Sequence, residues 1–170
     1  KNIKYLACSL SREAEASLSK CLREDNVIQA SGKLIFIGRL DSYKRVDWLI
    51  KAFSLVPNAY QLDIVGDGPD RENLEALAVQ LIRPNQKIYF HGRVNETIKI
   101  KLLAEADVMV LPSDRCNEAF GIVQLEAMAS GIPSLAFDLP LSGMHWVSSL
   151  PCLNWNGEPK QLHIVLQKLF

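Results

Sequence analysis

Five short apolar runs, separated by helical patterns, constrain the fold more than any other feature of this chain. The runs are rich in branched and aromatic residues and often stop at Gly or Pro, which is typical of strands buried on both faces of a parallel sheet. They are Lys33–Ile37, Gln61–Val65, Lys87–Phe90, Asp107–Leu111 and Pro133–Phe137. Strands that alternate with helices in this way predict an α/β fold with a doubly wound parallel sheet.

Apolar side chains recur between these runs at helical spacing, three and four residues apart. The spacing begins at Val46, at Leu74 and at Leu162, so it predicts helices after the first, second and last runs. A further helix is predicted over Glu96–Ala106, with Asn95 as its cap. Their alternation with the strands implies right-handed βαβ crossovers.

The chain has 170 residues, enough for one domain with a buried core. It begins with lysine, not methionine, and ends inside an amphipathic stretch, so we expect a fragment of a longer protein or an excised domain. Near the start, Tyr5–Cys8 suits a strand and Ser11–Leu22 a helix. We expect residues 1–30 to be a linker or part of a preceding domain, and residues 31–170 to form the α/β domain.

The composition limits the kinds of partner that this chain is expected to bind. The 19 basic and 19 acidic residues cancel, which argues against general attraction to nucleic acid or to an anionic membrane. No apolar run is long enough to span a bilayer, and no signal peptide is visible. The four cysteines form no CxxC pair and have no histidine at zinc spacing, as in a reducing cytoplasm. We therefore expect a cytoplasmic protein that binds no nucleic acid.

Ligands of a doubly wound sheet bind beyond the carboxyl ends of the strands, and a basic segment lies there after the first run. Gly38-Arg39-Leu40 follows the strand directly, and Lys44-Arg45 opens the next helix. Cations beside a glycine, where backbone can approach closely, suit a diphosphate. Basic residues are disfavoured at a helix start by the helix dipole, which also favours a bound anion. The alternative is a solvated basic turn.

Two further glycine-containing segments follow the second and third runs. Gly66-Asp67-Gly68-Pro69 lies at a strand end, although Gly and Pro there also suit a plain tight turn. In the segment His91-Gly92-Arg93-Val94, the glycine lets backbone lie close to a flat ligand such as a base. The alternative is an ordinary strand-to-helix loop in which His91 makes a structural hydrogen bond.

The most informative segment runs from residue 113 to residue 133. Glu118 precedes a helix predicted over Gly121–Ser130, whose free amides are available to a phosphate. Glu126 lies within that helix, and its neighbours three and four positions away are mostly apolar. A carboxylate on such a face needs a partner, and the hydroxyl groups of a ribose would serve. A partly exposed helix glutamate is the alternative.

Taken together, these segments resemble the C-terminal domain of retaining GT-B-fold glycosyltransferases of family four, the glycosyl transferases group 1. GRLDSYKRVDWLIKAF is similar to the family's G-R-L…K-G-x-D…L-I-x-A-F stretch, VGDGPDRENL to its G-x-G-P…L turn, and FHGRV to its F-x-G-x-V segment. EAFGIVQLEAMASGIP carries the family's E-x7-E motif, with Glu118 and Glu126 as the pair. The resemblance implies a Rossmann-like domain that forms one half of a GT-B fold.

The resemblance also implies roles by position. Arg39, Lys44 and Glu118 would be the catalytic residues: the two cations would hold the donor diphosphate, and the glutamate would bind hydroxyls of the transferred sugar. The ribose would meet Glu126, the base would meet backbone near residues 93 and 94, and amides of residues 120–122 would approach the phosphates. The donor-binding residues predicted in this way are Gly38, Gly66, Gly68, Arg93, Val94, Phe120, Gly121, Ile122 and Glu126.

The implied activity is transfer of a sugar, with retention at the anomeric carbon, from a nucleoside diphosphate sugar to an acceptor hydroxyl, in bacterial polysaccharide or glycolipid synthesis. Residues 31–170 would be the nucleotide-sugar-binding domain. An N-terminal domain missing from this chain would hold the glycan or lipid acceptor and make any contact with the inner face of the membrane. We expect no metal and no other cofactor. The chain alone is expected to bind its donor and to transfer nothing.

Alternative functions on this fold are a non-catalytic GT-B-like binding domain, half of a sugar-nucleotide epimerase, or half of a phosphorylase. The sequence also departs from the family at two places. Arg45 stands where the family often has glycine, and Asp138–Trp146 replaces a Gly-Gly…Glu loop. The resemblance therefore does not extend to the family's sugar contacts in that loop.

Overall fold

A five-stranded parallel sheet forms the centre of the computed structural model, which describes residues 10–19, 31–115, 121–137, 144, 155 and 158–170. The strands are β1 (Lys33–Ile37), β2 (Gln61–Val65), β3 (Lys87–Gly92), β4 (Val108–Leu111) and β5 (Ser134–Ala136). Their order across the sheet is β3-β2-β1-β4-β5, and every neighbouring pair is parallel. The chain therefore winds outward from β1 to β3, crosses back, and winds outward again from β4 to β5.

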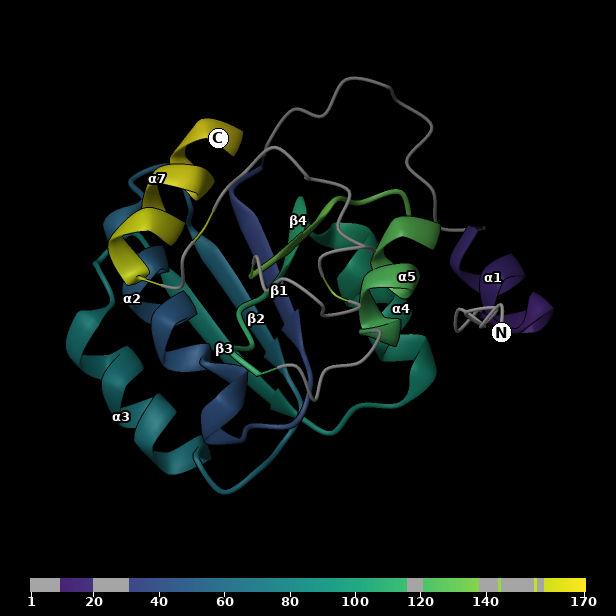
Figure 1. The fold of residues 1–170 in the computed structure, drawn as a ribbon, viewed down its shortest axis with the longest axis horizontal. Coiled ribbons are helices and arrows are strands. Elements are labelled where there is room, and N and C mark those ends of the chain that lie inside the picture. Colours follow the sequence, from purple (N-terminus) through teal and green to yellow (C-terminus); the bar gives the residue numbers. More distant parts are fainter. Residues whose placement is uncertain (1–9, 20–30, 116–120, 138–143, 145–154, 156–157) are drawn as a thin grey trace, which may run out of the picture.

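Helices cover both faces of the sheet, as a doubly wound fold requires (Figure 1). One face carries α2 (Val46–Leu55), α3 (Arg71–Leu81) and α7 (Pro159–Leu169). The other face carries α1 (Arg12–Ser19), α4 (Glu96–Glu105) and α5 (Ile122–Ala129). The predicted α/β class and doubly wound parallel sheet are thus confirmed.

Successive side chains of β1 are buried on opposite faces of the sheet. Leu34 and Phe36 belong to the apolar cluster under α2, α3 and α7, while Ile35 and Ile37 belong to the cluster under α4 and α5. A strand has a period of two, so a strand covered on both sides must be apolar throughout. This is why KLIFI is a continuous apolar run and not an alternating one.

Sequence-predicted boundaries agree with the structure to within one or two residues, and the differences have local causes. The third strand was predicted to end at Phe90 but continues to Gly92, because the Gly92 carbonyl accepts a hydrogen bond from the Gly66 amide at 2.8 Å. Asn95 caps α4 as predicted, its Oδ1 accepting from the Ile98 amide at 2.9 Å.

The N-terminal helix lies against α5. Its Leu18 is 1% exposed and belongs to the same apolar cluster as Ala127. The helix predicted over Ser11–Leu22 is therefore present as Arg12–Ser19 in the described residues, whereas the strand predicted at Tyr5–Cys8 lies outside them. The domain boundary expected near residue 30 stays a prediction.

Candidate functional site

The loops after β1, β2 and β3 meet at the carboxyl edge of the sheet and are joined by backbone hydrogen bonds. The Gly38 amide donates to the Val65 carbonyl at 3.0 Å, and the Leu40 amide donates to the Asp67 carbonyl at 3.0 Å. With the bond between Gly66 and Gly92, these contacts place three predicted segments side by side. The backbone of this edge is therefore a single hydrogen-bonded unit.

Two of the predicted glycines are required by the packing of these loops. Gly66 has φ +131°, and a Cβ there would collide with the Gly38 carbonyl oxygen. A Cβ on Gly68 would lie 2.5 Å from the Leu40 carbonyl oxygen, closer than side chains approach backbone. The close approach of loop to loop thus accounts for both glycines without a ligand, although Gly66 also borders the cleft described next.

An open cleft of about 400 Å³ lies at this edge. It is lined by Ile37, Gly38, Arg39, Val65, Gly66, Asp67, Arg93, Val94 and Lys99. Three of these side chains are cationic and one is a carboxylate, so the cleft carries a net positive charge suited to an anionic ligand. Its volume falls in the range of small-molecule sites.

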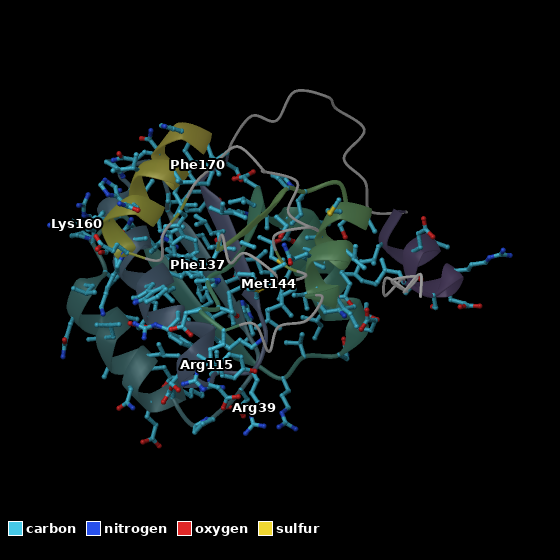
Figure 2. The ribbon with its side chains drawn as sticks, viewed as in Figure 1. Arg39, Arg115, Phe137, Met144, Lys160 and Phe170 are labelled. Carbon is cyan, nitrogen blue, oxygen red and sulfur yellow. The ribbon has the colours of Figure 1, made fainter. Side chains whose placement is uncertain are left out.

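The cation predicted at the end of β1 points away from the body of the protein. Arg39 lies at the lower edge of Figure 2, where the strands of Figure 1 end. Its side chain is 70% exposed, and its Nε lies 3.1 Å from a carboxylate oxygen of Asp41. An ion pair this exposed holds a side chain weakly, so Arg39 can turn toward a ligand at little cost.

Lys44, by contrast, is buried. It ends a short 3-10 helix, Ser42–Lys44, and its Nζ lies 5.1 Å from the centre of the Tyr43 ring. A Cβ on Gly38 would lie 3.9 Å from the Lys44 Cε, so the lysine stem runs beside the end of β1. The structure thus brings the predicted pair of cations to one loop, Arg39 in solvent and Lys44 inside.

Arg45 adopts the left-handed conformation, with φ +51° and ψ +37°, as it caps α2. Glycine adopts this conformation without strain, which gives a physical reason for glycine at this position in similar sequences. The Arg45 guanidinium lies 3.9 Å from the centre of the Trp48 ring, 3.2 Å from Asp47 and 3.8 Å from Asp114. These contacts offset the strain and tie the loop after β1 to the loop after β4.

The strand order of the sheet reverses between β1 and β4. The end of β4 and the start of α5 lie on the β4 side of this reversal. The Asp114 amide donates to the Tyr43 carbonyl at 3.0 Å, which again links the β4 end to the loop after β1. Gly121 is the N-cap of α5, with φ +49°, and Ile122, the first helical residue, is half exposed. The helix predicted over Gly121–Ser130 is therefore present as Ile122–Ala129, with Gly121 and Ser130 as its caps.

Glu126 has a partner within the protein. Its Oε1 lies 2.9 Å from the Nζ of Lys99, a residue of α4 that also lies 3.0 Å from a carboxylate oxygen of Glu96. The side chains of Glu126 and Lys99 are 13% and 16% exposed. Burial alone would lower the pKa of Lys99, but the hydrogen bonds and charges of Glu126 and Glu96 outweigh it and raise that pKa above its usual value. Lys99 is therefore protonated at neutral pH.

Five of the predicted site residues line the same cleft: Gly38, Arg39, Gly66, Arg93 and Val94. Five others are not part of that lining: Gly68, Lys44, Gly121, Ile122 and Glu126. Of these, Glu126 is connected to the cleft through Lys99. Glu118 and Phe120 fall outside the described residues. The predicted roles of all these residues stay predictions.

Sequence reasoning missed two cations of this edge. Lys99 lines the cleft, and Arg71 donates to the Phe90 carbonyl at 3.3 Å. Lys99 lies four residues before the buried Leu103, on the inner face of its helix. A lysine on the inner face needs an anionic partner, and this signal was present in the sequence.

His91 has a structural partner, as the alternative for its segment anticipated. Its Nε2 lies 2.7 Å from Oδ1 of Asp63, a buried residue of β2. A buried carboxylate needs such a hydrogen bond, so this contact accounts for a histidine at the position without a ligand.

A doubly wound domain with a cationic cleft at the carboxyl edge of its strands has a charge and a position that suit an anionic ligand. The family model for "Glycosyl transferases group 1" matches residues 22–145. The chain therefore belongs to this glycosyltransferase family, and its fold is that of one Rossmann-like half of a GT-B enzyme.

Individual relatives agree with the family. An uncharacterized glycosyltransferase of Methanocaldococcus jannaschii is 42% identical over 102 residues, covering 59% of this chain and 25% of that protein. The GtfA subunit of the UDP-N-acetylglucosamine–peptide N-acetylglucosaminyltransferase of Streptococcus agalactiae is 30% identical, covering 83% and 26%. The catalytic domain of a cholesterol-alpha-glucosyltransferase of Helicobacter pylori has a TM-score of 0.71 and 26% identity, covering 81% of this chain and 84% of that one. The chain thus spans about a quarter of the length of these two curated relatives.

Membranes and metal ions are two further partners to consider for the described residues. None of their helices has the length and apolar character needed to cross a membrane. Within the same residues, no three or more His, Cys, Asp or Glu side chains gather in a way that could hold a metal ion.

Proposed function

We propose that this chain is the donor-binding half of a retaining glycosyltransferase, and that the cleft at the carboxyl edge of β1, β2 and β3 binds a nucleoside diphosphate sugar. The observation that carries the proposal is the lining of that cleft, in which Arg39, Arg93 and Lys99 face a single carboxylate, Asp67. Net positive charge at this edge of a doubly wound sheet complements a diphosphate. The relative from Streptococcus agalactiae, named for UDP-N-acetylglucosamine, supports a donor of this class.

In the proposed arrangement the cations supply charge stabilisation. Arg39, at 70% exposure, is free to swing onto the diphosphate, while Lys44 is held beside the end of β1. As the bond to the sugar breaks, negative charge grows on the leaving diphosphate, and pre-placed cations stabilise that charge. Glu126 would accept hydrogen bonds from the ribose, and Glu118 from the transferred sugar.

Retention is proposed to occur without a covalent sugar–enzyme intermediate. Among the described residues that line the cleft, Asp67 is the one carboxylate, and it already accepts a hydrogen bond from the Gly68 amide at 2.9 Å and lies 3.8 Å from Arg71. These contacts fix the Asp67 carboxylate at the strand end, and no nucleophilic role is proposed for it. The leaving diphosphate would instead take the acceptor's proton as the acceptor hydroxyl attacks from the same face.

The acceptor site is proposed to lie mainly outside this chain, because the chain spans about a quarter of the curated relatives' length. Donor binding without transfer is then the expected behaviour of the chain alone, since an unpositioned acceptor forfeits about 7–11 kcal/mol of the barrier reduction that orientation can supply. Any membrane contact would also be made outside this chain. The full-length enzyme is proposed to lie in the cytoplasm or at the inner face of the membrane. No metal or other cofactor is proposed for donor binding, so EDTA should leave the affinity unchanged.

Thermal unfolding in the presence of UDP, GDP or ADP tests donor binding. Ligand at about 100 times its Kd should stabilise the protein by about 2.7 kcal/mol, a rise in Tm of roughly 5–10 °C. A protein that responds to none of the three nucleotides would contradict the proposal and favour a non-catalytic domain. With the full-length enzyme, NMR of the product should show the anomeric configuration of the donor; an inverted product would refute retention.

A further inference from the structure

Lys99 joins two helices through carboxylates on each. Its Nζ lies 2.9 Å from Glu126 Oε1 on α5 and 3.0 Å from Glu96 Oε1 on its own helix, α4. The Glu96 side chain is 63% exposed and that of Glu126 is 13% exposed, so the pair with Glu126 is the better shielded from water. An ammonium group has three N–H donors, so it can serve both carboxylates and still donate to a third group.

The same lysine borders the donor cleft. It lines the cleft together with Arg39, Asp67 and Arg93, which are the other charged groups there. Glu126 lies behind that lining, and its second oxygen, Oε2, is buried and accepts no hydrogen bond in the described part of the chain. Lys99 is therefore the side chain through which Glu126 is connected to the cleft.

A carboxylate beside a diphosphate site poses an electrostatic problem. Like charges repel, and a mostly buried carboxylate without a counter-charge tends to take up a proton. A cation near the start of a helix is also disfavoured by the helix dipole, so Lys99 occupies a position that needs a compensating partner. The contact with Glu126 meets both requirements, because each charge cancels the other.

We propose that Lys99 is a positioning residue of the donor cleft, which orients Glu126 and cancels its charge so that this carboxylate can accept a ligand hydroxyl close to a bound diphosphate. The inference rests on the proposed function, since it gives Lys99 a role in the same nucleotide site. It predicts that Lys99 acts on nucleotide affinity through Glu126.

The test compares Lys99→Met with Lys101→Met by titration calorimetry of UDP, GDP and ADP between pH 5.5 and 8.5. Lys101 lies on the same helix but is exposed, so its replacement controls for loss of one positive charge. Lys99→Met should weaken the best-binding nucleotide about tenfold at pH 7.5. Relative to wild type, the loss should shrink as pH falls and the uncompensated Glu126 takes up a proton. Lys101→Met should follow the wild-type pH profile.

Two further variants separate positioning from folding. Lys99→Arg keeps the charge and should restore most of the affinity. Lys99→Met combined with Glu126→Gln removes both charges, so it should fold even if the single variant does not, and it should lose the altered pH profile. The inference is overturned if Lys99→Met binds like Lys101→Met, or if the double variant keeps the altered profile.

The two proposals fail in different ways. A wild-type protein that binds none of the three nucleotides overturns the proposed function, and with it this inference. A wild-type protein that binds one of them, while Lys99→Met binds that nucleotide equally well at every pH, overturns the role of Lys99 alone.

Discussion

The two sides of the cleft at the carboxyl edge of the sheet, the proposed donor site, are held in different ways. On the side of β1, β2 and β3, backbone hydrogen bonds and glycine contacts fix the loops, while Arg39 reaches into solvent with 70% of its side chain exposed. On the side of α4 and α5, the ion pair between Lys99 and Glu126, both under a fifth exposed, joins two helices. One side is therefore rigid in backbone and adaptable in side chain, and the other depends on side chains already in place.

In the proposed nucleotide site, this difference would separate two tasks. An exposed cation meets a ligand that arrives in varied positions, because a weak surface pair is easily exchanged. A buried pair is costly to break, so it suits a contact whose geometry must not change. The predictions below test the contrast.

The largest effect is expected at Gly66, which holds the backbone side together. Gly66→Ala places a Cβ against the Gly38 carbonyl at φ +131°, so we expect a loss of about 4 kcal/mol or more and little folded protein. Gly131→Ala is the matched control, because Gly131 also has a positive φ (+77°) but is exposed, and it should cost about 1–2 kcal/mol. Urea unfolding measures both, and equal losses would contradict the loop-packing role.

The next effect distinguishes the two cations of the β1 loop. Lys44→Ala should weaken UDP or GDP by about 1.5–3 kcal/mol, because a charge-assisted contact from a buried, fixed lysine is lost. Arg39→Ala should cost about 1 kcal/mol or less, since its side chain is solvated before binding. Uridine and guanosine, which lack phosphates, should bind all these variants alike. If either cation affects nucleoside and nucleotide equally, it is not part of a diphosphate clamp.

A smaller effect is expected at Arg45, the strained residue that links the loops after β1 and β4. Arg45→Ala keeps the left-handed conformation but loses the contacts with Trp48 and Asp114, so it should cost about 1–2 kcal/mol of stability. Arg45→Gly loses the same contacts but relieves the strain, so it should stay within about 0.5 kcal/mol of wild type. Thermal unfolding compares the stabilities of the two variants. A glycine variant less stable than the alanine variant would contradict backbone strain at Arg45.

The smallest effect is a change of stability at high pH. Because the pKa of Lys99 is raised on folding, its stabilising contribution is complete below the unfolded lysine pKa of about 10.4 and is lost as pH rises through the higher folded pKa. Urea unfolding at pH 7, 9 and 11 should show wild type and Lys99→Met converging only at the highest pH. Convergence already at pH 9 would mean that the ion pair does not raise this pKa.

Much of the cleft could be predicted because the chemistry follows the strands. Five residues of the cleft lie within four positions of the end of an apolar run, and parallel strands end at one edge. They are Gly38, Arg39, Gly66, Arg93 and Val94. The sequence was less informative about the reason for each residue. Gly66 and Gly68 suggested ligand approach or a tight turn, whereas a collision between loops explains them. The colliding residues lie on loops that are far apart in the sequence, so no local pattern reveals the collision.

The sequence by itself determined the fold class, the edge of the sheet at which the candidate site lies, and most of the side chains on one side of the cleft. It could do so because burial on two faces and helix caps depend on a few neighbouring residues. Only the tertiary structure decided that the carboxylate of Glu126 meets Lys99. The two residues are 27 positions apart on different helices, and their contact depends on how α4 and α5 pack on the sheet. Local patterns indicated that Glu126 needs a partner, but only packing selects one.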